Sequence, residues 1–196
     1  MLLRTILFGK PYEFPDIRTL MGKANEEKSG DQLAGVAAIT TAERAAAKLV
    51  LSEVPLWVLY ENPAVPYEQD EVTRLIRDAV DPQVYGEIKG WTVGDLREWV
   101  LRDTTSAEEI RRISNGLTSE MVAAVTKLMS NLDLIYAAQK IRVVKHCVNS
   151  IGMPGTLSSR LQPNDPTDSP EGVRASIYEG LSYGSGDSVI GINPVD

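Results

Sequence analysis

Hydrophobic and polar residues alternate over the first fourteen positions of the chain and then recur at helical spacing for more than a hundred. The alternating segment, MLLRTILFGKPYEF, has Gly9-Lys10 at a point suited to a turn, which predicts a short β-hairpin. From Asp16 onward the spacing is typical of amphipathic helices. Residues 1–150 are therefore expected to form a β-hairpin followed by a mainly helical region.

Capping residues mark where several of these helices should begin. Thr40 and Thr92 are each followed three residues later by a carboxylate, Glu43 and Asp95, which is the pattern of a capping box. Ser106 is a further candidate cap. Apolar spacing and caps together predict helices over residues 44–54, 67–81, 93–101, 107–113 and 119–141.

Two of these segments show apolar stripes at helical spacing. One is formed by Val72, Leu75, Ile76 and Ala79, and a wider one by Met121, Val122, Val125, Leu128, Met129 and Leu132. A stripe of this width is what a helix packed against a core shows. We therefore interpret the wider stripe as a core face rather than as a cofactor-binding surface.

The pattern changes after about residue 150. Residues 156–162 (TLSSRLQ) and 188–193 (SVIGIN) predict strands, and Ser169 followed by Pro170 predicts the start of a helix between them. The expected core face of that helix is Val173, Ile177 and Leu181. Strand, helix and strand make a βαβ unit with parallel strands. Because parallel sheets are covered on both faces, either the helical region covers this unit in an unusual way or the chain is the front portion of a longer one. The second interpretation is the more economical.

Composition narrows the classes of function. With 196 residues, 43% hydrophobic and 24% charged, the chain is typical of a soluble globular protein. Its net charge of −7 argues against binding to nucleic acid or to an anionic membrane surface. Residues 1–14 lack the features of a signal peptide, and no stretch is long and apolar enough to span a membrane. The single Cys147 excludes an internal disulfide and a thiolate zinc site, which favours the cytoplasm.

Polar residues stand at the ends of the two expected strands, where ligands bind in α/β folds. Arg160 and Gln162 end the first strand and share one face, while Leu161 between them faces the other way. Asn193 and Pro194 end the second strand. A guanidinium and two amides could hold a small polar ligand. On this pattern alone, capping of the loops is the simpler interpretation.

Other candidate chemistry is weaker. His146 and Cys147 are adjacent in an extended segment and should point to opposite sides, so a catalytic pair is not expected. The G-x-G at residues 184–186 lacks a following helix and does not support a dinucleotide-binding loop. No spacing suggests a metal site or a hydrolase nucleophile.

Six segments carry a resemblance to a known family. They are residues 29–38 (SGDQLAGVAA), 43–53 (ERAAAKLVLSE), 72–76 (VTRLI), 116–125 (GLTSEMVAAV), 152–165 (GMPGTLSSRLQPND) and 177–195 (IYEGLSYGSGDSVIGINPV). In order and without a large gap, they resemble the amino-terminal part of the ethanolamine ammonia-lyase large subunit.

The resemblance implies an adenosylcobalamin-dependent radical lyase that converts ethanolamine to acetaldehyde and ammonia. Its large subunit has a mainly helical amino-terminal region followed by a TIM barrel, so residues 151–196 would be the start of a truncated barrel. Arg160, Gln162 and Asn193 match residues that contact the substrate, and Pro194 matches one that touches the cobalamin. No catalytic or metal-ligating residue is assigned in this chain.

The same resemblance implies partners and a location. A small subunit would hold the cobalamin together with the large one, and further large subunits would form the core of an oligomer. The location would be the cytoplasm or a bacterial microcompartment within it.

The resemblance leaves two further readings open. A barrel of this type has about 250 residues, so most of it is missing from this chain. The missing part includes the family's carboxylates that bind the substrate ammonium. The chain alone is therefore expected to be inactive. The first alternative is a helical assembly module without catalysis of its own. The second is a TIM-barrel lyase for another small amino alcohol.

Overall fold

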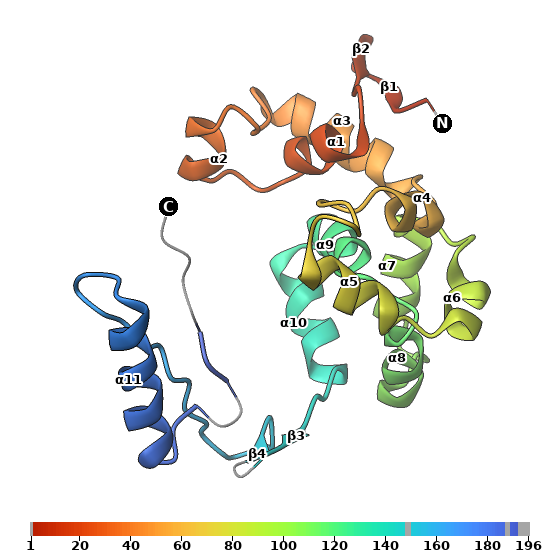
Figure 1. Cartoon of the computed structure of the whole chain (residues 1–196). Coiled ribbons are helices and arrows are strands. Elements are labelled where there is room, and N and C mark those ends of the chain that lie inside the picture. Colours follow the sequence, from red (N-terminus) through yellow and green to blue (C-terminus); the bar gives the residue numbers. More distant parts are fainter. Residues whose placement is uncertain (1, 148–149, 187–188, 192–196) are drawn as a thin grey trace. The chain divides into compact units, whose positions relative to one another are not determined.

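The computed structural model describes residues 2–147, 150–186 and 189–191 (Figure 1). Its contacts divide the chain into two compact units, Met1–Ile141 and Arg142–Asp196, which are described separately below. Asn193 and Pro194 lie outside the described residues. Among the described residues, no helix is both long and apolar enough to cross a membrane.

The first unit begins with the expected hairpin. Strands β1 (Arg4–Leu7) and β2 (Lys10–Glu13) are antiparallel, with their outermost residues paired. Phe8 and Gly9 form the turn with φ of 52° and 74°. Positive φ at both central residues is what a two-residue turn between right-twisted strands requires. The turn therefore lies one residue earlier than the Gly9-Lys10 position expected from the sequence.

Short helices make up the rest of the first unit. Their bounds are α1 (Ile17–Lys23), α2 (Ser29–Leu33), α3 (Thr41–Ser52), α4 (Leu56–Glu61), α5 (Glu71–Asp78), α6 (Pro82–Ile88), α7 (Val93–Leu101), α8 (Ala107–Ser114), α9 (Ser119–Lys127) and α10 (Asn131–Lys140).

The predicted helix caps are present. The Thr92 hydroxyl accepts a hydrogen bond from the Asp95 N–H at 3.0 Å, and the Asp95 carboxylate accepts one from the Thr92 N–H at 2.9 Å. Helix α8 begins with the same reciprocal pair. At α3, Thr40 caps the N–H of Glu43, but the Glu43 carboxylate accepts from the N–H of Ile39 at 2.6 Å. The second hydrogen bond of this capping box therefore goes to Ile39, one residue before the cap Thr40.

The prediction of one long helix over residues 119–141 is wrong, because two helices, α9 and α10, occupy this range. The Ser130 hydroxyl accepts from the Asp133 N–H at 3.2 Å, and the Asp133 carboxylate accepts from the Ser130 N–H at 3.0 Å. This capping box marks the start of α10. The apolar residues keep their helical spacing across the boundary between α9 and α10, so the spacing gave no sign of the boundary. The stripe is split as well, because Val122 is 47% exposed and Leu132 77% exposed.

The core of the first unit is built around α3. Ala46, Ala47, Val50 and Leu51 of this helix are buried, together with side chains contributed from Phe14 to Ala137. Helix α4, which the sequence pattern did not reveal, adds two almost fully buried leucines, Leu56 and Leu59. It has six residues, too few to show a helical period.

Helix α5 is oriented differently from what its apolar spacing suggests. Val72 and Leu75 of its stripe are 61% and 64% exposed, whereas Thr73 is buried. The Thr73 hydroxyl donates to the Asp70 carboxylate and to the carbonyl oxygen of Val65. These bonds hold the polar side of the helix against the unit.

The second unit contains two short strands, β3 (Lys145–His146) and β4 (Ser150–Ile151), and one helix, α11 (Pro170–Ser182), among its described residues. The helix begins where expected, with Ser169 as its cap and Pro170 in its first turn. Its predicted core face is only partly covered, since no residue of α11 is buried. The strand expected over 156–162 is absent apart from the bridge residue Leu161. Of the strand expected over 188–193, the described residues 189–191 contain only the bridge residue Ile190.

Candidate functional site

The two segments expected to be parallel strands lie side by side at their carboxyl ends. Leu161 donates its N–H to the carbonyl oxygen of Val189 at 3.1 Å, and Gly191 donates to the carbonyl oxygen of Leu161 at 2.8 Å. These bonds form a parallel bridge between Leu161 and Ile190. The bridge pairs the two segments in parallel on either side of α11 in the sequence, as the expected βαβ unit requires, but it is a single bridge and not a two-stranded sheet.

The side chain of Leu161 packs against the bare backbone of two glycines. A Cβ atom added at Gly180 of α11 would lie 2.5 Å from the Leu161 Cδ1. One added at Gly186 would lie 2.6 Å from the Leu161 Cβ. Both distances are too short for a real contact. At Gly186 the struck Cβ is fixed to the Leu161 backbone, so only glycine fits without a backbone shift, whereas at Gly180 the end of the leucine side chain would have to turn aside.

Arg160 and Gln162 meet on one side of the segment. The Arg160 Nη2 donates a hydrogen bond to the Gln162 Oε1 at 2.5 Å, and both side chains are exposed. Arg160 also reaches the neighbouring segment, where a Cβ added at Gly191 would lie 3.5 Å from its Nε. The prediction that Arg160 and Gln162 share one face is thus confirmed.

This pair offers hydrogen-bond donors to a ligand. A guanidinium has donors only, so its bond to Gln162 occupies the amide oxygen and leaves the amide NH₂ free. Together with the remaining N–H groups of Arg160, the pair suits an acceptor oxygen on a small polar molecule. Asn193, expected to join the pair, lies two residues beyond Gly191 and outside the described residues, as does Pro194.

Asp165, which the sequence analysis did not single out, fixes the loop that follows Gln162. One oxygen of its carboxylate accepts from the hydroxyl of Thr167 at 2.7 Å and from the N–H groups of Thr167 and Ser169, each at 2.9 Å. These hydrogen bonds, that of the Thr167 hydroxyl first, lower the pKa of Asp165. The spacing Asp-x-Thr-x-Ser is that of an Asx turn and could have revealed the role.

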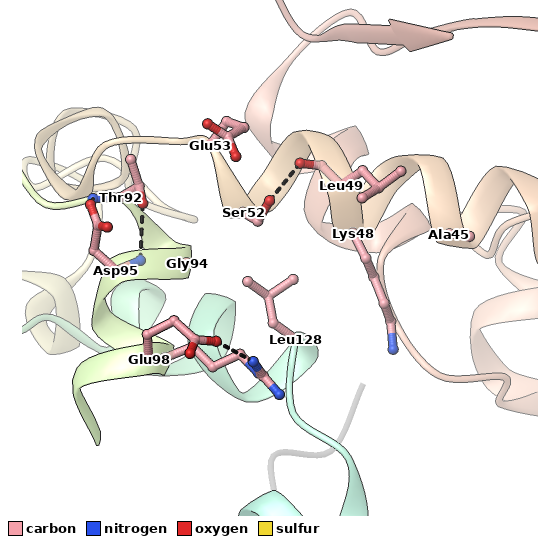
Figure 2. Close-up of a pocket in the computed structure, with 11 residues that line it drawn as sticks. Ala45, Lys48, Leu49, Ser52, Glu53, Thr92, Gly94, Asp95, Glu98 and Leu128 are labelled. Carbon is pink, nitrogen blue, oxygen red and sulfur yellow. Dashed lines mark hydrogen bonds and ion pairs between the residues drawn. The ribbon is translucent and has the colours of Figure 1, made fainter. Parts of the chain in front are cut away.

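The first unit has an open groove beside α3 and α7, about 640 Å³ in volume (Figure 2). Its polar groups are largely paired with each other. The Ser52 hydroxyl donates to the carbonyl oxygen of Leu49 at 2.7 Å, and Arg97 pairs with Glu98 at 2.5 Å and with Asp133 at 2.8 Å. The groove therefore presents few free groups to a ligand.

Other candidate chemistry in the described residues is sparse. His146 pairs its Nδ1 with the Ser150 hydroxyl at 2.7 Å, and Cys147 is exposed beside it. No cluster of three or more histidine, cysteine or acidic side chains suited to a metal ion occurs in the described part of the chain. The Arg160–Gln162 pair beside the Leu161–Ile190 bridge is thus the best candidate site.

Comparison with known proteins identifies the family of this chain. The family described as "Ethanolamine ammonia lyase large subunit (EutB)" matches residues 12–196. The chain belongs to the ethanolamine ammonia-lyase large subunit family. The resemblance noted in the sequence is confirmed, and both Arg160 and Gln162 lie within the matched range.

Individual relatives agree with this membership. The ethanolamine ammonia-lyase large subunit of Escherichia coli strain K12 is 54% identical over 195 residues, which cover 100% of this chain and 43% of that protein. That of Salmonella typhimurium strain LT2 is 53% identical over the same shares. The chain thus spans less than half the length of these ethanolamine ammonia-lyase relatives.

Proposed function

We propose that this chain is the amino-terminal part of the catalytic large subunit of an ethanolamine ammonia-lyase, which deaminates ethanolamine to acetaldehyde and ammonia. The observation that carries the proposal is the identity of 54% along the whole chain. The Arg160–Gln162 pair beside the Leu161–Ile190 bridge supports it, because its donors suit a small polar substrate.

The substrate is proposed to lie with its hydroxyl end at this pair. Arg160 and Gln162 present N–H groups to the hydroxyl oxygen, and Asn193 is proposed to complete the site. The positive charge of Arg160 disfavours a substrate ammonium beside it. The ammonium end is therefore proposed to point away, toward carboxylates supplied by the part of the subunit that follows this chain.

Residues 151–196 are proposed to begin a TIM barrel that holds the substrate. The parallel bridge between Leu161 and Ile190, with α11 as the crossover, supports this proposal. A closed barrel would exclude water from the reacting substrate. The helical unit that precedes it is proposed to contact other large subunits in an oligomer.

The cofactor is proposed to be adenosylcobalamin, bound between the large subunit and a small subunit. When bound, it supplies the radical that abstracts hydrogen from the substrate, while the protein supplies orientation and shielding. Pro194 is the residue of this chain proposed to touch it. The described residues contribute the substrate-binding pair. The assembled enzyme is proposed to work in the cytoplasm or in a bacterial microcompartment.

A chimeric subunit tests the proposal. This chain replaces the matching part of the Escherichia coli relative, and the chimera is mixed with the small subunit, adenosylcobalamin and ethanolamine. We expect acetaldehyde to form. Arg160→Ala and Gln162→Ala should each lower kcat/KM, by about tenfold for the neutral amide and more for the charged group. Ser158→Ala, an exposed neighbour, is the matched control and should have no effect.

The second candidate is an assembly module without catalysis of its own. Leu33 and Ile39, close in sequence before α3, are 90% and 86% exposed, which favours a contact with another protein. If the chimera assembles but neither it nor its Arg160 and Gln162 variants deaminate ethanolamine, this alternative is preferred. The other alternative, a lyase for a different small amino alcohol, is tested by comparing substrates in the Gln162→Ala and Asn193→Ala chimeras. Deamination of a different amino alcohol by either variant would indicate that the substituted side chain determines substrate specificity.

A further inference from the structure

The half-buried Leu161 contacts the neighbouring segment through its backbone and two glycines through its side chain. Its N–H and carbonyl oxygen both bond to the neighbouring segment, at Val189 and Gly191. Its side chain reaches Gly180 and Gly186, where an added Cβ would lie 2.5 Å and 2.6 Å from Leu161 atoms and would force the leucine to shift.

We propose that Leu161 is a positioning residue that aims Arg160 and Gln162 through its packing against Gly180 and Gly186. This inference rests on the proposed function, because it assigns to the substrate-binding pair a residue that holds it in place. Leu161 touches no substrate. It acts by fixing the backbone from which the two polar side chains project on the opposite face.

The backbone at the two glycines that contact Leu161 is itself held in place. The carbonyl oxygen of Gly180 accepts from the N–H groups of Tyr183 at 3.1 Å and Ser185 at 3.0 Å, which closes the end of α11. Gly186 is buried and has φ of 89°, a conformation that other residues rarely adopt. The end of α11 and the turn after it thus meet the Leu161 side chain from two directions.

Movement of Leu161 would be transmitted directly to the site. Arg160 and Gln162 are its immediate neighbours, and Arg160 also rests against Gly191, whose N–H bonds to Leu161. A shift of the leucine would therefore displace both polar groups together. Misplacement of a binding group by about 1 Å can reduce catalysis by about a hundredfold.

Gly180→Ala in the chimeric enzyme is the first test. The new methyl group would press on the Leu161 Cδ atoms, so we expect KM for ethanolamine to rise about tenfold, with a smaller change in kcat. Glu179→Ala is the matched control on the same helix, because Glu179 is exposed, and should leave KM unchanged. Circular dichroism should show α11 intact in both variants.

A double substitution separates positioning from a general loss of structure. Leu161→Ala removes the Cδ atoms that the methyl of Gly180→Ala would strike, so the double variant should show a smaller rise in KM than the product of the single effects. The methyl of Gly186→Ala would strike the Leu161 Cβ, which alanine retains. That pair should therefore show no rescue.

A second readout needs no activity. In the chain alone, NMR of the Gln162 side-chain amide and the Arg160 Nε–H reports their hydrogen bond. Gly180→Ala should shift both signals toward those of a free peptide, and adding Leu161→Ala should move them part of the way back.

The two readouts separate the two claims. An unmodified chimera that never deaminates ethanolamine, with the NMR shifts as expected, contradicts the proposed function and leaves the positioning role supported. Unchanged NMR signals in Gly180→Ala overturn the role of Leu161. So does an activity loss with constant KM, or a double variant without rescue.

Discussion

Two side chains, Asp165 and Lys127, have pKa values lowered by their surroundings, which makes local order and stability depend on pH. Asp165 holds the loop between Gln162 and α11 by accepting three hydrogen bonds, which lower its pKa from the ordinary 3.8. A carboxylate with a lowered folded-state pKa contributes stability above its unfolded pKa and loses it as the pH falls through the folded value. The loop should thus be held at neutral pH and released only in acid.

Asp165→Asn tests this role. The amide oxygen can still accept the Thr167 and Ser169 hydrogen bonds, but it no longer titrates. We expect the amide NMR signals of Thr167 and Ser169 to move below about pH 4 in the unmodified chain and to stay constant in the variant. Asp168→Asn, in the same loop, is the control and should keep the acid transition. A transition that survives in Asp165→Asn would contradict the assignment.

Lys127 at the end of α9 is expected to be destabilising in its charged form. Burial, followed by the nearby charge of Lys28, lowers its pKa from 10.5, and its ammonium donates to the side-chain oxygen of Asn25. Because the unfolded state binds this proton more tightly, stability rises with pH between the folded and unfolded pKa values.

Lys127→Met should therefore raise the thermal midpoint at pH 7, and the gain should shrink as the pH rises toward 10.5. Calorimetry at several pH values measures both effects. Lys28→Met, an exposed neighbour, is the control and should change the midpoint less. A lower midpoint for Lys127→Met at pH 7 would show that its bond to Asn25 outweighs the cost of burial.

At the level of elements, the sequence predicts where helices begin better than it predicts which helix faces are buried. Thr92, Ser106 and Ser169 cap the helices expected of them because a cap depends on residues within one turn. Apolar periodicity was less reliable. It continued across the break at Ser130, and on α5 it marked a face that the structure leaves exposed.

The candidate site divides in the same way. Strand alternation alone predicted that Arg160 and Gln162 share a side, and their hydrogen bond confirms it. The contact of Leu161 with Gly180 and Gly186 joins residues that are nineteen and more positions apart. No local pattern encodes such a contact, so the sequence could not reveal it. The positions of Asn193 and Pro194 stay predictions.

Two helix starts of the first unit offer a matched test of capping. Ser130→Ala removes the hydroxyl that caps α10 and should cost about 0.5–2 kcal/mol in the free energy of unfolding. At α9 the hydroxyl of Thr118 is buried without a hydrogen-bond partner, so Thr118→Val should leave stability unchanged or raise it. Urea unfolding measures both. A large loss in Thr118→Val would reveal a bond that its hydroxyl makes in solution.

At the level of the whole molecule, stability is concentrated in the first unit. Its buried core extends from Phe14 to Ala137, whereas α11 in the second unit has no buried residue. Backbone amides of helices α3, α7 and α9 should therefore exchange with deuterium far more slowly than those of α11. Exchange monitored by mass spectrometry measures this difference. Equal protection in α11 would show that the second unit is more tightly packed than its burial indicates.

The most direct test of the central claim compares the chain alone with the chimeric large subunit. Each is mixed with the small subunit, adenosylcobalamin and ethanolamine, and acetaldehyde is measured. We predict that the chimera forms acetaldehyde, that its Arg160→Ala variant does so much more slowly, and that the chain alone forms none. A folded, assembled chimera without activity, or a chain that turns over ethanolamine by itself, would contradict the account.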